Sequence, residues 1–343
     1  MMMPIAQPPV SAVLMALWNA SGGELPMQEL VRESDLPLGQ VQEALGVLAQ
    51  RGAHIERTPT SLRLVQAGLK NWGDIMTAVA RRNRWKVGRQ VIVVEATSST
   101  NDLAWQLAGA DSADGTNDAG DGLVVLSDVQ SAGRGRLGHS WHAKPGQSVL
   151  MSVMIRHVAA GSLDRLTLLA GLATAVALEE IAGGALARVE IKWPNDLLVS
   201  GRKMSGILIE SSPQVHNAVV VGIGVNVAQA PHAGDYPADL AGRAISLFEE
   251  AGKIFDRLRV VLAILRQLDA HLLRGDSDWI GDWKSRCAML GRTITLRAGT
   301  ELISGQILDV EPLNGLVLRD ERGHTRLFSA QTCSVADENI RKP

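Results

Sequence analysis

The sequence predicts a mixed α/β protein that carries a small helical unit before its main domain and a small β unit after it. Up to about residue 65, short apolar segments recur at helical spacing, and glycines follow the first and the third of them. Between residues 91 and 227, runs of β-branched residues alternate with longer helical segments, which is typical of an α/β layer. From about residue 289, short strand-like runs are separated by Gly-containing turns, which indicates a small barrel.

The N-terminal segment has the order of elements of a winged helix-turn-helix. We expect helices at Val10–Asn19, Met27–Glu33 and Leu38–Gln50, and a β wing at His54–Leu64 that is broken at Thr58-Pro59-Thr60. Between Glu24 and Thr60, six acidic residues stand against three arginines. Because phosphate neutralisation carries much of the affinity for DNA, two alternatives stay open for this unit: operator binding, or retention for packing.

A helix is expected between Gln66 and Gln90, and it ends in the basic cluster Arg81-Arg82-Asn83-Arg84-Trp85-Lys86. Cations near a helix C-terminus interact favourably with its dipole, so a solvated helix end is preferred here over a polyanion site. The acidic segment Asp111–Asp121 lacks the glutamate that closes an EF-hand, which predicts a flexible insertion.

The main domain should contain, in chain order, a strand at Val91–Glu95, a helix after Ser98 or Ser99, strands at Leu123–Leu126 and Ser148–Ile155, a helix at Leu163–Ile181, a hairpin around Gly201 and a strand at Val219–Val227. Four segments are therefore expected: 1–65, a linker at 66–90, the main domain at 91–286 and a β domain at 287–343.

Composition narrows the class of protein. The net charge is −2, from 36 acidic and 34 basic residues, so no global polyanion-binding field is expected. Cys287 and Cys333 neither build a disulfide framework nor match a metal-site spacing, so the expected location is the reducing cytoplasm. The apolar run Val10–Trp18 lacks a charged flank, and Leu166–Leu178 is too short to cross a bilayer. We therefore expect a soluble cytoplasmic protein with no membrane partner.

The most informative stretch is Q-S-A-G-R-G-R-L-G-H-S-W, from Gln130 to Trp141. Its glycines let backbone amides approach a ligand, and Arg134 and Arg136 supply guanidinium groups suited to phosphate oxygens. The stretch therefore indicates an anion-binding loop and nucleotide chemistry.

The same glycines also spell G-x-G-x-x-G, the dinucleotide-binding fingerprint. That fingerprint needs a helix that opens inside it, and Pro145 and Gly146 follow too soon for a helix of useful length. A Rossmann site is therefore disfavoured, and a P-loop is excluded because G-x-x-x-x-G-K-[ST] is absent.

A second motif, K-W-P-N-D at Lys192–Asp196, precedes R-K-M-S-G-I at Arg202–Ile207. Apolar and polar residues alternate on both sides of Ser200-Gly201, which predicts a hairpin with Lys203 beside its turn. With these motifs the chain resembles the biotin protein ligases, including the bacterial form that is also the biotin operon repressor. Their pattern is G-R-G-R-x-G-x-x-W, K-W-P-N-D and R-K-x-x-G-I, in this order and at compatible spacing. Further matches are Ser99-Thr100-Asn101, Ser152 and Gly222-Ile223-Gly224-Val225-Asn226.

The resemblance runs from about Val91 to the C-terminus. It implies a class II synthetase-like mixed-sheet catalytic domain, an N-terminal winged helix-turn-helix and a C-terminal SH3-like β-barrel. It also implies two reaction steps: biotin and ATP form biotinyl-5′-AMP with Mg²⁺ present, and biotin then passes to a lysine of a biotin carboxyl carrier protein, a subunit of acetyl-CoA carboxylase. Operator DNA is a further candidate partner, and a homodimer is a candidate assembly.

The resemblance assigns roles residue by residue. Charge stabilisation falls to Lys203, Arg134 and Arg136. Biotin would be held by Ser99, Thr100, Asn101, Gln130, Gly133, Arg134, Gly135, Arg136, Lys203, Gly206, Gly222 and Gly224. The nucleotide would lie near Trp141, Lys192, Asn195 and Asn226, and Asp196 is the candidate Mg²⁺ ligand.

Each role has a structural alternative. Lys203 could be a surface lysine at a turn, Asn101 a helix cap, and Trp141 a core residue. Tight strand packing would also explain the glycines.

The chain departs from the family pattern at two places. Leu137 and His139 stand where many relatives have further arginines, which predicts weaker retention of the intermediate. Phe328-Ser329-Ala330-Gln331 stands where relatives often carry a Gly-Glu turn. Two other functions stay open: a lipoate or octanoate ligase of the same fold, whose R-R-x-x-G-G-x-x-x-H loop is absent here, and a non-enzymatic biotin-sensing DNA-binding regulator.

Overall fold

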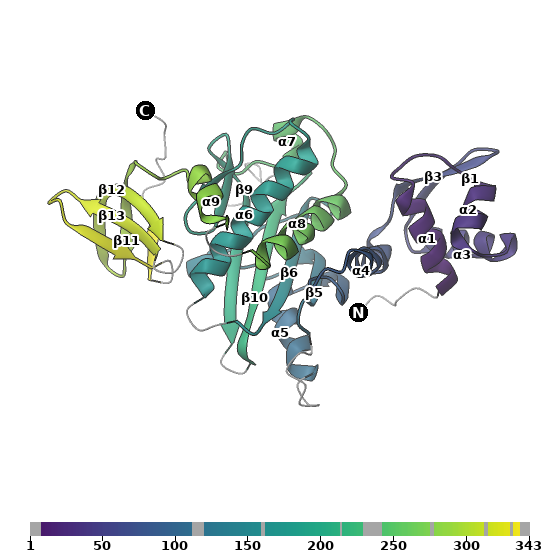
Figure 1. Cartoon of the computed structure of the whole chain (residues 1–343), viewed down its shortest axis with the longest axis horizontal. Coiled ribbons are helices and arrows are strands. Elements are labelled where there is room, and N and C mark those ends of the chain that lie inside the picture. Colours follow the sequence, from purple (N-terminus) through teal and green to yellow (C-terminus); the bar gives the residue numbers. More distant parts are fainter. Residues whose placement is uncertain are drawn as a thin grey trace.

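The computed structural model describes residues 8–111, 120–158, 162–212, 215–228, 242–274, 278–311, 315–329 and 332–336. A large sheet with its helices lies in the middle of the molecule, with a helical unit at one end and a β unit at the other (Figure 1). Residues 112–119 of the expected acidic insertion, residues 313 and 314 of the Gly-containing turn expected at 313–315, and residues 330 and 331 of the segment that departs from the family pattern lie outside the described residues. Among the described helices, none combines the length and apolar character that spanning a membrane requires.

The N-terminal unit contains the three predicted helices and the predicted hairpin. Its elements are α1 (Pro8–Asn19), β1 (Leu25–Pro26), α2 (Met27–Ser34), α3 (Leu38–Gln50), β2 (His54–Arg57) and β3 (Ser61–Gln66), with the strands in the order β1-β3-β2. In α3 the buried residues are Val41, Ala44, Leu45 and Leu48, which lie three or four residues apart and form one apolar face.

The expected linker helix is shorter than residues 66–90. It comprises η1 (Leu69–Asn71) and α4 (Trp72–Arg82), because the backbone turns through positive φ angles at Gly68 and Arg84. Arg51 of the N-terminal unit pairs with Asp74 of α4 at 2.9 Å, and both side chains are largely buried. The helix is thus fixed to the N-terminal unit as well as to the central sheet.

The central sheet is mixed, as predicted. Its strand order is β4-β5-β6-β10-β9-β8-β7, and only the β4–β5 pair among these strands is parallel. The bounds are β4 (Val91–Thr97), β5 (Val124–Gln130), β6 (Ser148–Arg156), β7 (Glu190–Lys192), β8 (Asp196–Val199), β9 (Arg202–Ser212) and β10 (Val215–Asn226).

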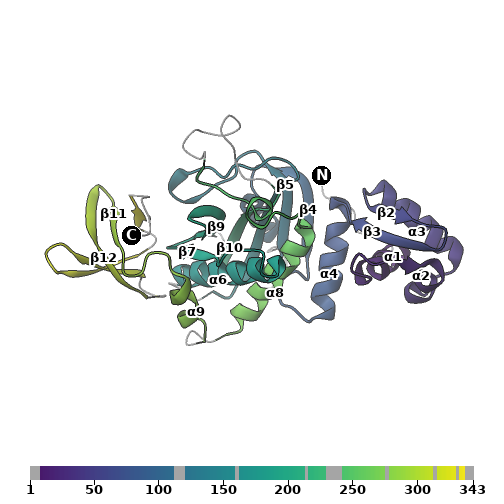
Figure 2. The ribbon, with the colours of Figure 1, turned by 90° about the horizontal axis from the view of Figure 1, so that it is seen from above.

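Helices cover the two faces of this sheet unequally. The apolar helices α6 (Leu163–Ala182) and α8 (Arg257–Leu272) lie side by side on one face (Figure 2), while α5 (Thr100–Asp111) packs on the other. Successive side chains of β5 point to opposite faces of the sheet. Val124 and Leu126 therefore pack in the core under α6 and α8, and Val125 packs in the cluster under α5. Because α5 covers only part of its face, the rest is open for a site.

Two short helices complete the central part, α7 (Leu247–Ala251) and α9 (Ile280–Arg286). The C-terminal strands β11 (Thr293–Ala298), β12 (Glu301–Glu311), β13 (Gly315–Asp320), β14 (Thr325–Phe328) and β15 (Cys333–Val335) form an antiparallel sheet in the order β14-β13-β12-β11-β15. The Ser329 hydroxyl donates to the Asp164 carboxylate of α6 at 3.1 Å, so this unit reaches the central domain.

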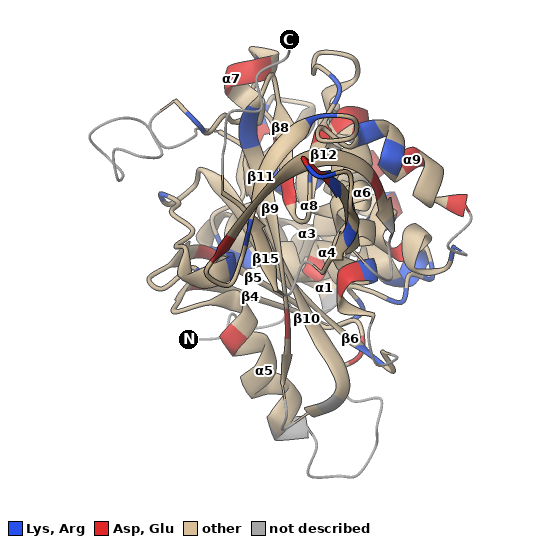
Figure 3. Ribbon diagram, turned by 90° about the vertical axis from the view of Figure 1, so that its left-hand side faces the viewer, with Lys and Arg blue, Asp and Glu red and all other residues tan. Residues whose placement is uncertain are grey.

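Charges of both signs are interspersed over the described residues on the side of the molecule that carries the C-terminal unit (Figure 3).

Candidate active site

A cavity of about 750 Å³ opens on the sheet face that carries α5. Gly222 and Gly224 of β10 alternate in step with Val220, which packs in the cluster under α5, so they face this cavity. Most of the predicted residues line it: Ser99, Thr100, Asn101, Gln130, Arg134, Gly135, Arg136, Trp141, Lys192, Asn195, Asp196, Lys203, Gly206, Gly222 and Gly224. Gly133 and Asn226 do not belong to the lining. The Asn226 amide instead donates to the carbonyl of Ile245 at 3.3 Å.

The arginine-glycine loop, residues 133–141, folds back on itself as a small hairpin. The Gly135 amide donates to the His139 carbonyl at 2.7 Å, and the Trp141 amide donates to the Gly133 carbonyl at 2.9 Å. A Cβ atom on Gly133 would lie only 2.7 Å from the Trp141 carbonyl oxygen, so glycine is required there by the loop itself. Leu137, at the tip, has a φ of 54° and is 63% exposed.

The Trp141 ring lies on glycines of β9 and β10, the two longest strands of the central sheet. A Cβ atom on Gly224 would lie 2.6 Å from Cε2 of the ring, and one on Gly206 would lie 3.1 Å from Cζ3. The indole N–H of Trp141 is buried and has no hydrogen-bond partner among the described residues. These glycines therefore make room for an aromatic ring that also lines the cavity.

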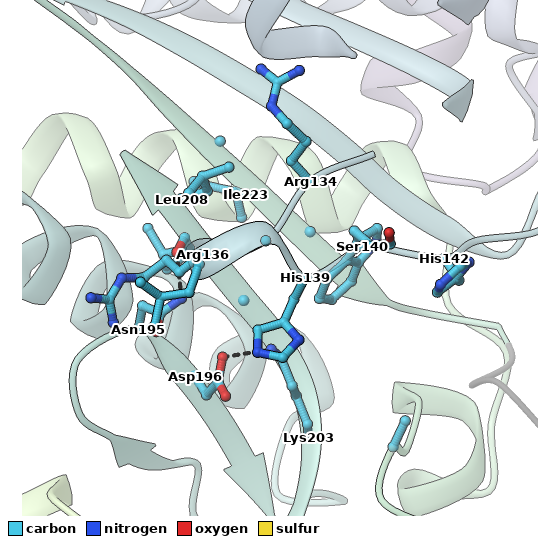
Figure 4. A pocket seen from close by; sticks show the side chains of 18 of the residues that line it. Arg134, Arg136, His139, Ser140, His142, Asn195, Asp196, Lys203, Leu208 and Ile223 are labelled. Atoms are coloured by element: carbon cyan, nitrogen blue, oxygen red, sulfur yellow. Dashed lines mark hydrogen bonds and ion pairs between the residues drawn. The ribbon is translucent and has the colours of Figure 1, made fainter. Parts of the chain in front are cut away.

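Lys203 is positioned by the predicted hairpin of β8 and β9. Ser200 and Gly201 have φ angles of 51° and 74°, as a two-residue type I′ turn requires. The Lys203 ammonium lies 2.6 Å from the Asp196 carboxylate and 5.6 Å from the centre of the Trp141 ring. Asp196 is the only carboxylate in the described lining, and Lys203 and Asp196 point toward each other in Figure 4. The lysine is thus held at the cavity wall rather than in open solvent.

An uncharged polar network forms another wall. The Thr100 amide and hydroxyl donate to the Gln130 side-chain oxygen at 2.7 and 3.1 Å. The Ser152 hydroxyl lies 2.7 Å from the Thr100 hydroxyl and 2.6 Å from the Asn101 side-chain oxygen, and it can donate to only one of them at a time. Asn101 is buried in this network and does not act as a helix cap. Such a wall suits a neutral ligand with several hydrogen-bonding groups.

The two loop arginines point in different directions (Figure 4). Arg134 donates to both oxygens of Asp102 at 2.7 and 2.8 Å and also contacts Glu210. The hydrogen bond from Arg134 is the largest influence on Asp102 and lowers the pKa of that carboxyl. Burial lowers the pKa of Arg136, and nearby Cys333, Asp164 and Asp196 oppose that effect. An arginine keeps its charge in proteins, so Arg136 is a partly desolvated cation.

Asn195 has a structural bond as well as a place in the cavity. Its amide donates to the Ile207 carbonyl at 2.8 Å, and the Ile207 amide donates back to the Asn195 carbonyl at 2.9 Å. These bonds fasten the K-W-P-N-D motif, which contains a cis peptide bond between Trp193 and Pro194, to strand β9.

Several site residues are absent from the sequence prediction. Ser334 and Val335 of β15 line the cavity from the C-terminal unit, and Asp102 and Glu210 hold Arg134. Neither cysteine offers a thiolate, because burial raises the pKa of Cys287, and that of Cys333 to about 11.

A metal ion would find few ligands here. Over the described ranges, no group of three His, Cys, Asp or Glu side chains could hold a metal ion. Asp196 supplies one carboxylate, and Lys203 already contacts it. This donor set suits a Mg²⁺ ion that arrives with nucleotide phosphates, because Mg²⁺ commonly takes one or two protein carboxylates and completes its shell with phosphate and water.

Known proteins share this sequence and fold. Residues 93–226 match the profile of the Biotin/lipoate A/B protein ligase family. The chain is 33% identical over 251 residues to the Bifunctional ligase/repressor BirA of Bacillus subtilis, covering 71% of this chain and 74% of that protein. It is 32% identical to the Biotin--[acetyl-CoA-carboxylase] ligase of Mycobacterium tuberculosis, covering 71% and 87%. A biotin protein ligase from Aquifex aeolicus, solved in complex with biotin and ATP, superposes with a TM-score of 0.61 and 27% identity over 72% of this chain and 98% of that one.

The sheet, the loop and the lysine hairpin thus define a ligase of the biotin and lipoate class. Within that class, the chain belongs to the biotin protein ligase family, and it is an enzyme. The family resemblance predicted from the motifs is confirmed.

Proposed function

We propose that this enzyme activates biotin with ATP and then attaches it to a specific lysine of a biotin carboxyl carrier protein, a subunit of acetyl-CoA carboxylase. In the first step a biotin carboxylate oxygen bonds to the α-phosphorus of ATP and pyrophosphate leaves. In the second step the amine of the acceptor lysine bonds to the acyl carbon and AMP leaves. Two relatives that are named Biotin--[acetyl-CoA-carboxylase] ligase support both biotin as the acid and acetyl-CoA carboxylase as the acceptor.

The position of Lys203 carries the proposal. Its ammonium lies at the cavity wall, next to one carboxylate and facing the Trp141 ring. Two anions, a carboxylate and an α-phosphate, must approach each other in the first step, and a fixed cation between them stabilises the charge that develops. No protein nucleophile is needed, which is consistent with the protonated thiols at Cys287 and Cys333.

The remaining roles follow the walls of the cavity. The ureido ring of biotin would bond the uncharged side chains of Ser99, Thr100, Asn101 and Gln130, which line the cavity. Gly206, Gly222 and Gly224 would let biotin approach the backbone of β9 and β10 closely. Arg136 would face phosphate, where a partly desolvated guanidinium is most effective. Gly133 and Gly135 would shape the loop. Trp141, Lys192 and Asn195 would border the nucleotide, and Asn226 would act indirectly through its bond to Ile245.

Mg²⁺ would enter with ATP and use Asp196 as its protein ligand. When bound, the ion would neutralise phosphate charge and orient the pyrophosphate that leaves. The Asp196 carboxylate would then be shared between the ion and Lys203.

The test is exchange of labelled pyrophosphate into ATP, measured separately with biotin, lipoate and octanoate. We expect exchange with biotin alone. Exchange with octanoate or lipoate instead of biotin would assign the chain to the sister ligases, and exchange with none of the three acids would contradict adenylate formation by this chain.

A second candidate function, operator binding, is supported by the order and packing of α1, α2, α3 and the β2–β3 hairpin, which we propose to be a winged helix-turn-helix. The charges oppose it: α3 contains no Lys or Arg, and Arg32, Arg51 and Arg63 each pair with a carboxylate. Binding of a biotin-operon fragment by the full chain, lost on deletion of residues 1–65, would support repression. Equal weak binding by both proteins would reject it.

The C-terminal sheet is proposed to be the SH3-like barrel of the family, with the segment boundaries near residues 65, 90 and 286. Its strand β15 would help to hold nucleotide, because Ser334 and Val335 line the cavity. A homodimer is also proposed, and sedimentation with and without biotin and ATP would test it.

A further inference from the structure

Arg134 is engaged by carboxylates on more than one side. Its two terminal nitrogens donate to the two oxygens of Asp102 at 2.7 and 2.8 Å. One of these nitrogens also contacts Glu210 at 3.1 Å, and Nε reaches the same carboxylate at 3.3 Å. Every nitrogen of the guanidinium therefore has a carboxylate acceptor. Two acidic groups neutralise this cation, and it points away from the Asp196 and Lys203 side of the cavity (Figure 4).

These contacts join three parts of the chain. Asp102 lies in the first turn of α5, Glu210 lies on β9, and Arg134 lies at the start of the arginine-glycine loop. Trp141, at the other end of the loop, is seated on Gly206 and Gly224. The loop is thus fastened at both ends, with exposed Leu137 between them.

Glu210 also reaches the uncharged wall. It accepts a hydrogen bond from the Asn101 amide at 2.7 Å, and the Asn101 oxygen bonds Ser152. The position of the loop and the orientation of Asn101 therefore depend on one shared carboxylate.

We propose that Asp102 and Glu210 form a carboxylate latch that holds the arginine-glycine loop closed through Arg134. Arg134 is then a positioning residue, and Arg136 and Lys203 are the cations that face the reacting anions. The side chains of Arg134, Asp102 and Glu210 are 38%, 39% and 28% exposed, so water screens the latch and it can open and close. The latch deepens the proposed function, because a closed loop would retain the reactive adenylate.

The latch is tested directly by hydrogen-exchange mass spectrometry on the full-length protein. We expect the amides of residues 133–141 to exchange about fivefold faster in Asp102→Asn, Glu210→Gln and Arg134→Gln than in the wild type, the scale of a partly exposed ion pair. The double variant Asp102→Asn with Arg134→Gln should exchange no faster than Arg134→Gln alone, because both changes break the same contact. Glu95→Gln is the matched control, since Glu95 on β4 pairs with Lys70 of η1 and its side chain is 71% exposed.

Unchanged exchange in both acid variants would overturn the latch. Global unfolding is recognised separately, because exchange would then rise in the buried helix α6 as well; in that case Arg134→Lys, which keeps the charge but loses the paired hydrogen bonds, should give a smaller local rise. None of these measurements needs activity, so the latch and the ligase proposal fail independently.

A kinetic readout separates the two acids. Asp102→Asn should release biotinyl-adenylate about fivefold faster while the KM for biotin stays the same. Glu210→Gln should also raise the KM for biotin, because Asn101 loses its charged acceptor. Identical kinetics of the two variants would contradict the shared role of Glu210.

Discussion

The Lys203 ammonium and the Asp196 carboxylate lie 2.6 Å apart across the β8–β9 hairpin, at the wall of the cavity. The pair explains how a lysine beside a turn, only 38% exposed, is kept at a defined place. It also places a cation and the candidate Mg²⁺ ligand side by side, where a carboxylate and a nucleotide would meet.

Lys203→Ala should lower biotin-dependent pyrophosphate exchange by about 10² to 10³, the cost of removing one preorganised charge-stabilising group. Lys203→Arg should recover only part of this loss, because the larger planar guanidinium cannot occupy the same point. Lys253→Ala is the control, since Lys253 donates to the Ala182 carbonyl at the end of α6. Full activity of Lys203→Ala would remove the lysine from the reaction.

Gly224→Ala should displace the Trp141 ring, because the new methyl group would lie 2.6 Å from Cε2. We expect a loss of about 2 kcal/mol in unfolding free energy, typical of overpacking, and weaker biotin binding by calorimetry. Gly109→Ala in α5 meets no atom within 4 Å and should stabilise the protein by up to about 1 kcal/mol. Unaltered binding by Gly224→Ala would show that the ring has no part in the site.

Leu137→Arg should slow the release of biotinyl-adenylate about threefold, because it would add a cation to the loop that we propose closes over this anion. The left-handed backbone at position 137 is equally strained with either side chain, so the comparison isolates charge. Leu273→Arg, at a residue that is also 63% exposed, is the control. If Leu137→Arg did not change the retention of biotinyl-adenylate, an arginine at position 137 would have no role in holding the intermediate.

Glu179 should make stability depend on acid pH. Burial raises the pKa of its carboxyl, but hydrogen bonds from Arg286 and the Val189 amide outweigh burial and leave the pKa lowered. Its contribution is therefore complete above the ordinary glutamate pKa of about 4.3 and is lost as the pH falls toward the lowered value. Glu179→Gln should cost about 2 kcal/mol at pH 7 and flatten this dependence in urea titrations. Glu180→Gln breaks an exposed ion pair with Arg266, and it should neither lower the unfolding free energy by this amount nor flatten its pH dependence.

Local patterns were sufficient to predict the elements that build the site. The period of apolar residues located α3 and α6, and Ser200-Gly201 between alternating runs located the β8–β9 turn. The same patterns did not predict α8, which contributes a large share of the core. They also predicted a linker helix longer than the observed one, because the positive φ angles at Gly68 and Arg84 limit the helical region on its two sides.

Contacts between distant residues were beyond the sequence. Arg134 meets Asp102 and Glu210 across 32 and 76 residues, and no local pattern records that pairing. The glycines of β9 and β10 indicated a close approach, but only the three-dimensional arrangement shows that Trp141 is what approaches them. Ser334 enters the cavity wall because the C-terminal sheet folds against the loop side of the central domain.

The most direct test of biotin activation at Lys203 is a single-turnover reaction with excess enzyme, ATP and biotin, quenched and analysed for biotinyl-5′-AMP by mass spectrometry. We predict that the wild type accumulates the adenylate in the absence of acceptor protein and that Lys203→Ala forms it at least 10²-fold more slowly. No adenylate from a folded wild type that binds both biotin and ATP would contradict this mechanism.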